Sequence, residues 1–309
     1  MLKKNTYIII LTLCMISLIS AAQQPSVYQV KRMPFSSGPY SEIAPVIVDN
    51  GVVFCSDRRT TGIKSRKTFE DKRLYNLFIV GQKDSSSWTK PEEIKSERSF
   101  YFNSGPLCFS PGGTTVYFTS EVETGKVTRK KNYENHSGIF IADVAGTTLS
   151  SVRPFPYNSS QYEVGHPSVS SDGKYLFFAS DMPGGYGRSD IYYCEWINGQ
   201  WSTPVNAGSA VNTAAAENYP FMHPSGRLYF SSDRPGGRGR LDVWYSMLTL
   251  GAWDAPSVLP EPINSSSDDF AFVADENLQT GFFASNRVSS DDIFRFASTI
   301  IRKSSCDTL

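Results

Sequence analysis

The feature that most constrains the fold of this chain is an internal repeat. Residues Pro167 to Trp196 read PSVSSDGKYLFFASDMPGGYGRSDIYYCEW, and 53 residues later a second copy starts at Pro220 as PFMHPSGRLYFSSDRPGGRGRLDVWYSM. Self-similarity at a fixed spacing is typical of repeat architectures. Aromatic and β-branched residues alternate with Gly, Pro and Asp turn signals in both copies, so each copy predicts three short strands.

Three fainter copies flank these two and give five repeats in all. Each repeat has a proline or phenylalanine early in its first strand, at Pro45, Pro106, Pro167, Pro220 and Phe272. The second strand ends in a phenylalanine followed two residues later by a serine: Phe54/Ser56, Phe118/Ser120, Phe178/Ser180, Phe230/Ser232 and Phe283/Ser285. A Trp-x-x-Pro motif indicates a fourth, outer strand, where proline does little harm; it occurs at Trp88, Trp201 and Trp253.

Repeated units of four short strands predict an all-β fold, a five-bladed β-propeller of four-stranded blades. The expected blades cover about residues 41–98, 99–158, 159–209, 210–262 and 263–300. The fifth repeat has no fourth strand of its own, whereas Tyr28 to Phe35 form an unassigned strand ahead of the first repeat. We expect residues 28–35 to join the last blade and close the ring, which removes an open seam. Six blades are the less favoured alternative, because they would need a degenerate repeat in the loops.

The first 22 residues have the pattern of a secretory signal peptide. Lys3 and Lys4 precede an apolar run, and Ser20-Ala21-Ala22 offers small residues for cleavage after Ala22. Cys14 follows a leucine, whereas a lipid-acceptor cysteine needs a small residue before it, so we do not expect a lipoprotein. We therefore predict a periplasmic or secreted protein with no transmembrane segment after signal cleavage and a polar tail at 301–309.

Net charge limits the expected classes of partner, and the cysteine positions bear on whether disulfides form. The chain has 30 basic and 30 acidic residues, a balance that does not favour nucleic acid or an anionic membrane surface as a partner. Four cysteines follow the signal peptide, at Cys55, Cys108, Cys194 and Cys306. A disulfide framework is one reading for an exported protein. We favour buried free thiols, because three of the four fall in predicted strands of different repeats.

The best-preserved runs, SSDGKYLFFASDMPGGYGRSDI and HPSGRLYFSSDRPGGRGRLDV, resemble a known propeller repeat. They are similar to the WD-repeat-like repeats of TolB-family periplasmic proteins, and to propellers that precede OmpA-like domains in envelope proteins of Bacteroidetes. The resemblance covers residues 28–300 and implies a propeller scaffold facing the cell envelope. Neither an OmpA-like domain nor the amino-terminal domain of TolB is recognisable in the sequence, so the resemblance does not transfer TolB's partners.

A set of polar residues just ahead of the first strands is the candidate binding site. It comprises Glu42, Asn103, Glu163, Glu217 and Asp269. First strands line the channel of a propeller, so we expect these residues to form a ring near one mouth, where they could bind a cation, a peptide amine or sugar hydroxyls. The alternative is structural: one similar residue per blade could tie each blade to the next by accepting backbone N–H bonds.

Other conspicuous motifs point to structure. The Ser-Asp-Arg runs and the later Asp190, Asp242 and Asp292 fit loop fixing, and the Pro-Gly-Gly loops lack the helix N-terminus of a phosphate site. The three histidines, His136, His166 and His223, show no zinc-ligand spacing. No Gly-x-Ser-x-Gly elbow is present, so propeller peptidases with an α/β-hydrolase domain are not indicated. We expect no catalytic residue, metal or cofactor.

The sequence thus predicts a monomeric, exported, non-enzymatic propeller scaffold. Its expected partner is a protein or peptide of the bacterial envelope, of the outer-membrane or peptidoglycan-associated kind. The alternative is a carbohydrate-binding or glycoside-hydrolase-like propeller that uses the acidic ring, since five-bladed glycosidases have carboxylates at the channel mouth.

Overall fold

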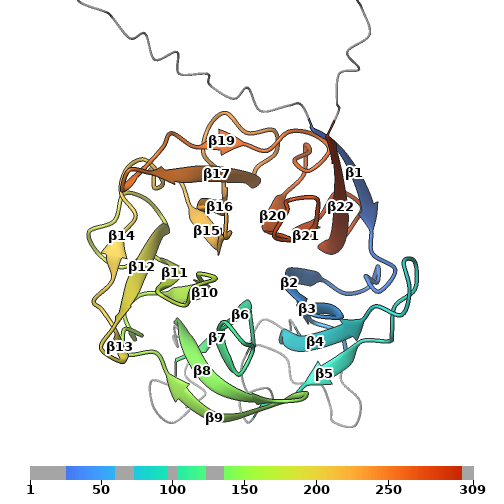
Figure 1. The fold of residues 1–309 in the computed structure, drawn as a ribbon, viewed down its shortest axis with the longest axis horizontal. Helices are drawn as coiled ribbons and strands as arrows, with labels where there is room; N and C mark the ends of the chain where they lie inside the picture. The colour runs from blue at the N-terminus through green and yellow to red at the C-terminus, as the bar shows by residue number, and fades with distance from the viewer. Residues whose placement is uncertain (1–25, 60–72, 97–102, 123–135, 301–309) are drawn as a thin grey trace, which may run out of the picture.

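The computed structural model describes residues 26–59, 73–96, 103–122 and 136–300. The described chain forms twenty-two strands in five antiparallel sheets, arranged radially around a central axis (Figure 1). The prediction of a five-bladed β-propeller is therefore confirmed. The predicted signal peptide, Cys14, Cys306 and the tail at 301–309 lie outside the described residues.

The first two blades are four-stranded meanders in which each strand pairs with the next along the chain. Blade 1 contains β2 (Glu42–Val48), β3 (Gly51–Ser56), β4 (Asn76–Gly81) and β5 (Glu92–Ile94). Blade 2 contains β6 (Leu107–Phe109), β7 (Thr115–Glu121), β8 (Ser137–Ala145) and β9 (Thr148–Pro154). The first strand of each blade faces the central channel and the last lies on the outer rim (Figure 1).

Blades 3 and 4 have an outer strand that is split into two short pieces. Blade 3 contains β10 (Val164–Val169), β11 (Tyr175–Ser180), β12 (Asp190–Ile197), β13 (Gln200–Trp201) and β14 (Val205–Asn206). Blade 4 contains β15 (Glu217–Met222), β16 (Arg227–Ser232), β17 (Asp242–Thr249), β18 (Ala252–Trp253) and β19 (Ser257–Val258). Both split pieces pair with the third strand of their blade, and the proline of the Trp-x-x-Pro motif lies between them.

Blade 5 is completed by the start of the chain, as predicted. It contains β20 (Asp269–Ala274), β21 (Thr280–Ser285) and β22 (Asp292–Ile300), and β1 (Ser26–Arg32) is its outer strand. The pairing of β1 with β22 is continuous from Ser26↔Ile300 to Arg32↔Phe294. The Arg32 guanidinium also bonds the buried Asp292 carboxylate at 2.6 Å. The two ends of the propeller are thus joined by a full ladder and an ion pair.

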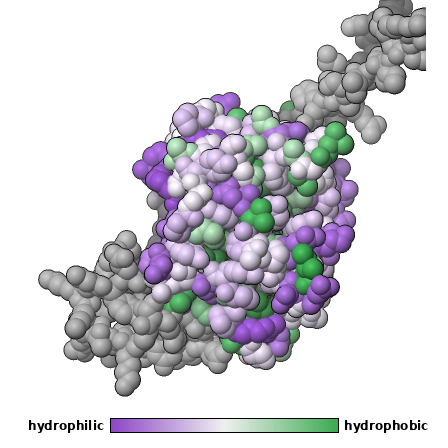
Figure 2. All heavy atoms as spheres, turned by 90° about the vertical axis from the view of Figure 1, so that its left-hand side faces the viewer, coloured by the Kyte–Doolittle hydropathy of each residue, from purple (hydrophilic) through white to green (hydrophobic). Residues whose placement is uncertain are grey.

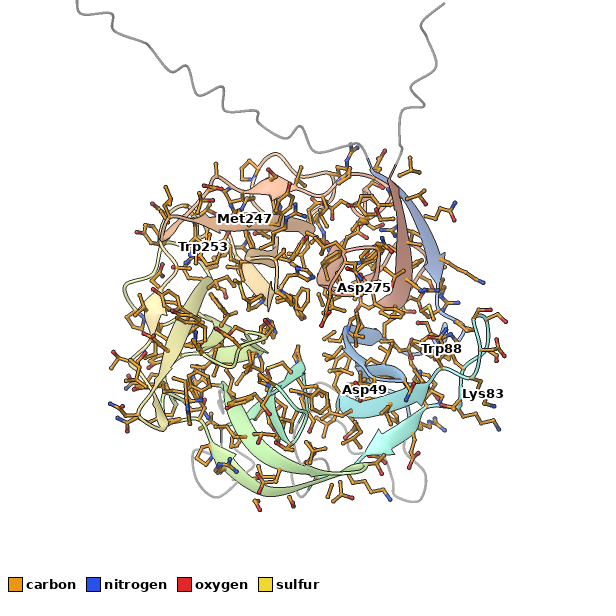
Figure 3. All side chains as sticks on the ribbon, viewed as in Figure 1. Asp49, Lys83, Trp88, Met247, Trp253 and Asp275 are labelled. Carbon is orange, nitrogen blue, oxygen red and sulfur yellow. The ribbon has the colours of Figure 1, made fainter. Side chains whose placement is uncertain are left out.

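Aromatic side chains fill the space within and between blades. The repeated phenylalanines of the second strands, Phe54, Phe118, Phe178, Phe230 and Phe283, are almost completely buried. Each tryptophan of the Trp-x-x-Pro motif reaches an aromatic ring of the preceding blade, with Trp88 on Phe282, Trp201 on Tyr117 and Trp253 on Phe177. Figure 3 shows Trp88 and Trp253 at two of these blade junctions. The motif therefore serves to pack neighbouring blades together.

The outer wall at blade 3 is mainly polar. Figure 2 shows the side formed by blade 3, where hydrophilic residues predominate and apolar residues are scattered. Within the described chain, no helix is long and apolar enough to cross a membrane.

The described cysteines are free thiols, as expected. Cys55 and Cys194 are buried and Cys108 is half-buried, and none of the three forms a disulfide. Burial raises the pKa of each of these thiols to about 12. They behave as small apolar residues of the blades.

Candidate functional site

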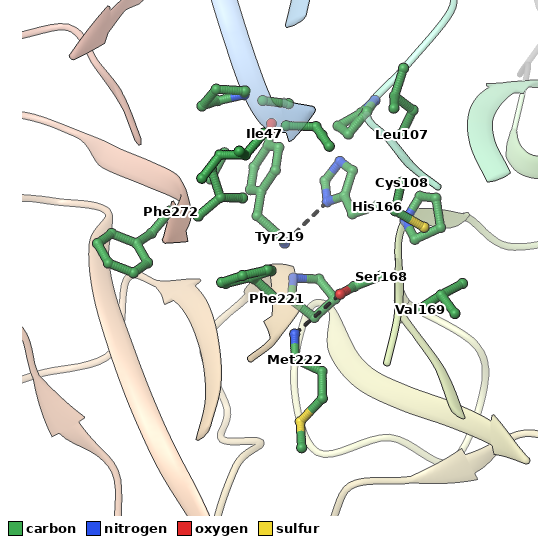
Figure 4. A pocket seen from close by; sticks show the side chains of 18 of the residues that line it. Ile47, Leu107, Cys108, His166, Ser168, Val169, Tyr219, Phe221, Met222 and Phe272 are labelled. Carbon is green, nitrogen blue, oxygen red and sulfur yellow. Dashed lines mark hydrogen bonds between the residues drawn. The ribbon is translucent and has the colours of Figure 1, made fainter. Parts of the chain in front are cut away.

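The central channel contains a cavity of about 290 Å³ that is lined by the inner strands of all five blades. Its wall is mainly apolar and includes Ile47, Leu107, Val169, Phe221 and Phe272 (Figure 4). In blades 3, 4 and 5 the lining begins in the middle of the inner strand and continues past its C-terminal end, for example from His166 to Ser171 in blade 3. We call the mouth at this end the strand-end mouth.

The cavity is framed by one equivalent residue from each inner strand, which we call the channel ring. It consists of Ala44, Pro106, His166, Tyr219 and Ala271. In blades 1, 3, 4 and 5 a bulge interrupts the pairing of the first two strands here, and the four ring members of these blades have φ angles between 51° and 54°. Side chains rarely adopt this left-handed conformation, so the bulge is a specific feature of the blade. It recurs around the ring and belongs to the fold.

The rings of His166 and Tyr219 are stacked at the centre of this arrangement. Their centroids are 4.0 Å apart with an interplanar angle of 12°. The backbone N–H of Tyr219 donates to Nδ1 of His166 at 3.4 Å, as the dashed line in Figure 4 shows. Burial lowers the pKa of His166 to about 4, so its imidazole is neutral at neutral pH. Burial also raises the pKa of Tyr219.

A second, polar pocket of about 210 Å³ lies at the other end of the channel, where the inner strands begin. It lies between blades 2, 3 and 4 and includes Glu163, Asp181, Arg188 and Asn218. His166 lines both the polar pocket and the apolar cavity. The channel therefore has two chemically different ends that meet at the His166–Tyr219 stack.

The structure places three of the five predicted ring residues inside the blades. Glu42, Glu217 and Asp269 are each fully buried and occupy the same register position, opposite Ser56, Ser232 and Ser285. Each carboxylate accepts bonds from the backbone and hydroxyl of a residue in the connection from the preceding blade, namely Ser37, Thr213 and Ser265. These bonds are the blade-to-blade ties of the structural alternative.

Each of the three carboxylates is also paired with the arginine that follows the second strand of its own blade. The pairs are Glu42–Arg58 at 2.8 Å, Glu217–Arg234 at 3.0 Å and Asp269–Arg287. Each guanidinium lies over two aromatic rings of the blade, as Arg234 does over Phe230 and Trp244. Burial raises the pKa of Glu42 and lowers that of Arg234, so desolvation opposes both charges and the pairing compensates for it.

The other two predicted residues lie one position earlier in register. In blade 3 the register position of Glu217 is taken by Val164, which pairs with Ser180. Glu163 precedes it, accepts the backbone N–H of Ser137 and contacts His136 at 3.2 Å, and 44% of its side chain is exposed. In blade 2, Asn103 accepts the backbone N–H of Tyr75. The five residues thus occupy two kinds of environment.

Two of the interpretations as structural motifs agree with the contacts observed. The aspartates of the Ser-Asp-Arg runs accept backbone N–H groups ahead of the inner strands, as Asp57 does from Ser41 and Asp233 does from Ala216. The Pro-Gly-Gly loops close onto buried aspartates, since Asp190 accepts the backbone N–H groups of Tyr186 and Gly187. Among the described residues, no group of three or more His, Cys, Asp or Glu side chains could hold a metal ion.

Sequence reasoning missed the channel ring. In four blades its member is the residue immediately before the repeated proline or phenylalanine, as His166 and Tyr219 are. In blade 2 the register is shifted by one residue, so that Pro106 itself lies in the ring. The available signal was variation: this position is alanine, histidine or tyrosine in blades 1, 3 and 4, whereas the next residue is proline in all three.

Comparison with known proteins adds to the assignment of the fold. No protein-family profile matches the chain, and no curated protein is significantly similar to it in sequence. Among solved structures, a putative TolB from Agrobacterium tumefaciens is 16% identical, with 87% of this chain and 81% of that chain covered and a TM-score of 0.50. A glycoside hydrolase is 10% identical, with 90% and 96% covered and a TM-score of 0.52.

The fold is a five-bladed β-propeller, similar to that of the putative TolB. At these identities the likeness concerns the fold alone, and the glycoside hydrolase shares it. The choice between binding and catalysis therefore depends on the chemistry of the channel.

Proposed function

We propose that the protein is an exported, non-enzymatic propeller scaffold that binds a protein or peptide of the bacterial cell envelope. The partner contacts the strand-end mouth of the channel. The protein acts as a monomer and needs no cofactor for this role.

One observation supports this proposal above the others: the channel combines an accessible apolar cavity with buried, neutralised acids. The wall of the cavity offers side chains such as Phe221, Met222 and Phe272, which are of the kind that form the cores of protein interfaces. Glu42, Glu217 and Asp269 accept bonds from neighbouring residues and are paired with arginines. They are therefore unsuited to proton transfer with a substrate in the channel.

The cellular location is inferred from the sequence. The apolar run and small residues before Gln23 fit a cleaved export signal. The repeat resembles that of TolB-family propellers, and the fold is similar to that of a putative TolB. The export signal and the resemblance to TolB propellers both favour a partner in the cell envelope.

Affinity capture from envelope extracts tests the proposal, using two matched variants. Ser171 is exposed and lines the strand-end mouth, so Ser171→Arg places a charged side chain at the binding surface. Ser85 is an exposed serine in the loop after β4 of blade 1, so Ser85→Arg makes the same change elsewhere. We expect Ser171→Arg to lose the captured protein and Ser85→Arg to retain it. Equal capture by both variants would contradict binding at this mouth.

A carbohydrate-binding or glycosidase-like role is the second candidate, and Glu163 is the observation that favours it. Its half-exposed carboxylate shares the polar pocket with Asp181, and glycosidases use two carboxylates. Glu163→Gln and Asp181→Asn should then abolish binding on a glycan array or turnover of glycan substrates. If wild-type protein gives no glycan signal, this candidate is rejected.

A further inference from the structure

We propose that the stacked pair of His166 and Tyr219 forms a binding site for a small, uncharged, mainly apolar molecule that has a carbonyl oxygen. This site goes beyond the proposed function, because its ligand is a free small molecule in the cavity and not the protein partner at the mouth. The proposal depends on three features: two polar groups without partners, the apolar wall, and the space left by neighbouring alanines.

The first polar group is Nε2 of His166. Nδ1 accepts the backbone N–H of Tyr219, so the proton of the neutral imidazole is on Nε2. Within the described residues Nε2 has no hydrogen-bond partner. Figure 4 shows this ring nitrogen pointing away from the bond to Tyr219. His166 therefore presents a free N–H donor to the channel.

The second polar group is the hydroxyl of Tyr219. It too has no hydrogen-bond partner among the residues that the structure describes. Because the two rings are stacked almost in parallel, the hydroxyl and the His166 N–H lie on the same side of the stack (Figure 4). One carbonyl oxygen has two lone pairs and can accept from both groups at once. A ligand carbonyl would thus accept from two donors that have no acceptor among the described residues.

The surroundings select against charge. Apolar side chains such as Leu107 and Val169 form most of the cavity wall, and the charged lining residue, Glu276, is exposed at the rim. An ionic group would lose its hydration on entering such a cavity. The carboxylate of Asp291 lies close enough to Tyr219 to add to the increase in its pKa that burial causes, so an anion would also be repelled.

The space for the ligand results from the unequal side chains of the channel ring. His166 and Tyr219 occupy two positions, whereas blades 1 and 5 have Ala44 and Ala271 at the equivalent positions. These methyl groups leave open the part of the channel that larger side chains would fill. The resulting volume of about 290 Å³ is near the lower end of the range of roughly 300–1,000 Å³ for small-molecule sites.

The test uses three probes of matched shape: cyclohexyl methyl ketone, cyclohexanecarboxylate and cyclohexylmethylammonium. Each is titrated into the full chain with ¹⁵N-labelled histidine, and binding is read from the Nε2 resonance of His166. We expect saturable binding of the ketone and at least tenfold weaker binding of both ions. Tyr219→Phe keeps the ring stack but removes the hydroxyl, and should weaken ketone binding about tenfold.

His166→Asn is the second variant, since asparagine tolerates a left-handed backbone, and it is read from the thermal shift that the ketone causes. The proposal is overturned if the ketone produces no saturable change at His166, or if either folded variant binds the ketone as tightly as wild type. Partner capture by the strand-end mouth is a separate readout. Loss of that capture with ketone binding intact would contradict the proposed function and leave this site standing.

Discussion

The buried pair of Glu217 and Arg234 provides the sharpest test of the structural role of the acidic residues. Glu217→Gln keeps the shape of the side chain but removes its charge. The Glu217 carboxylate accepts from Thr213 at 2.9 Å and 2.8 Å, from Ser232 at 2.8 Å and from Arg234 at 3.0 Å. The variant leaves a guanidinium that is only 8% exposed without its counter-charge.

The expected loss follows from the energetics of buried ion pairs. Removing one partner typically costs about 3–5 kcal/mol, because the remaining charge stays desolvated. A glutamine oxygen can still accept from Arg234, so we expect a value near the lower limit, about 3 kcal/mol. For a chain of 309 residues that corresponds to a decrease in Tm of about 5 °C.

Urea unfolding followed by tryptophan fluorescence and calorimetry measures both quantities. Glu163→Gln is the matched control, because 44% of that side chain is exposed and it contacts a histidine and one backbone N–H, with no arginine. The control should change the free energy of unfolding by less than about 1 kcal/mol. If Glu217→Gln is as stable as the control, the carboxylate is not a structural tie and the original idea of a ligand-binding ring regains support.

Three further predictions concern pH, glycine and ring closure. Burial holds the pKa of His166 at about 4, below its ordinary 6.5, so its contribution to stability is complete above pH 6.5 and is lost as the pH falls towards 4. Between pH 7 and pH 5, the free energy of unfolding of the wild type should therefore fall by about 2 kcal/mol more than that of His166→Asn, as measured by urea titrations. The same dependence of unfolding free energy on pH in both proteins would contradict this. Gly187→Ala should destabilise the fold by more than about 2 kcal/mol, because a Cβ at this position would lie 2.2 Å from two backbone carbonyl oxygens. Gly38→Ala is the control: its Cβ would have no atom within 4 Å, so it should leave the stability unchanged in the same assay. Arg32→Ala should lower the free energy of unfolding by about 2 kcal/mol, since it leaves the fully buried Asp292 carboxylate unpaired. Lys31→Ala, on the exposed side of β1, is the control and should have little effect on the denaturation midpoint.

Much of the fold could be predicted because the repeat applies the same constraint five times. A phenylalanine followed by Ser at one offset fixes the second strand of every blade, and the observed second strands end at Ser56, Ser180, Ser232 and Ser285 as that pattern requires. The last repeat lacks a fourth strand, and the start of the chain has one strand that belongs to no repeat. Closure of the ring by β1 could therefore be predicted by counting strands. Pairing with β22 over seven residues confirms it.

The site was harder to predict, because side-chain direction depends on a bulge that the sequence does not show. Glu217 was placed correctly at the start of an inner strand, but its carboxylate turns into the blade to meet Arg234. The bulge directs His166 and Tyr219 to the channel, and its left-handed residues are neither glycine nor asparagine, so no residue type indicated it. The one-residue shift at Pro106 also depends on tertiary pairing.

Site-specific photo-crosslinking tests whether a partner binds at the strand-end mouth of the channel. A photoreactive residue is placed at Ser171 on that mouth, at Glu163 in the polar pocket, or at the fully exposed Leu250 between β17 and β18. Each protein is exposed to envelope extract and irradiated. We expect a discrete cross-linked protein from position 171 and none from position 250. Cross-links from position 163 or 250, with none from position 171, would contradict this.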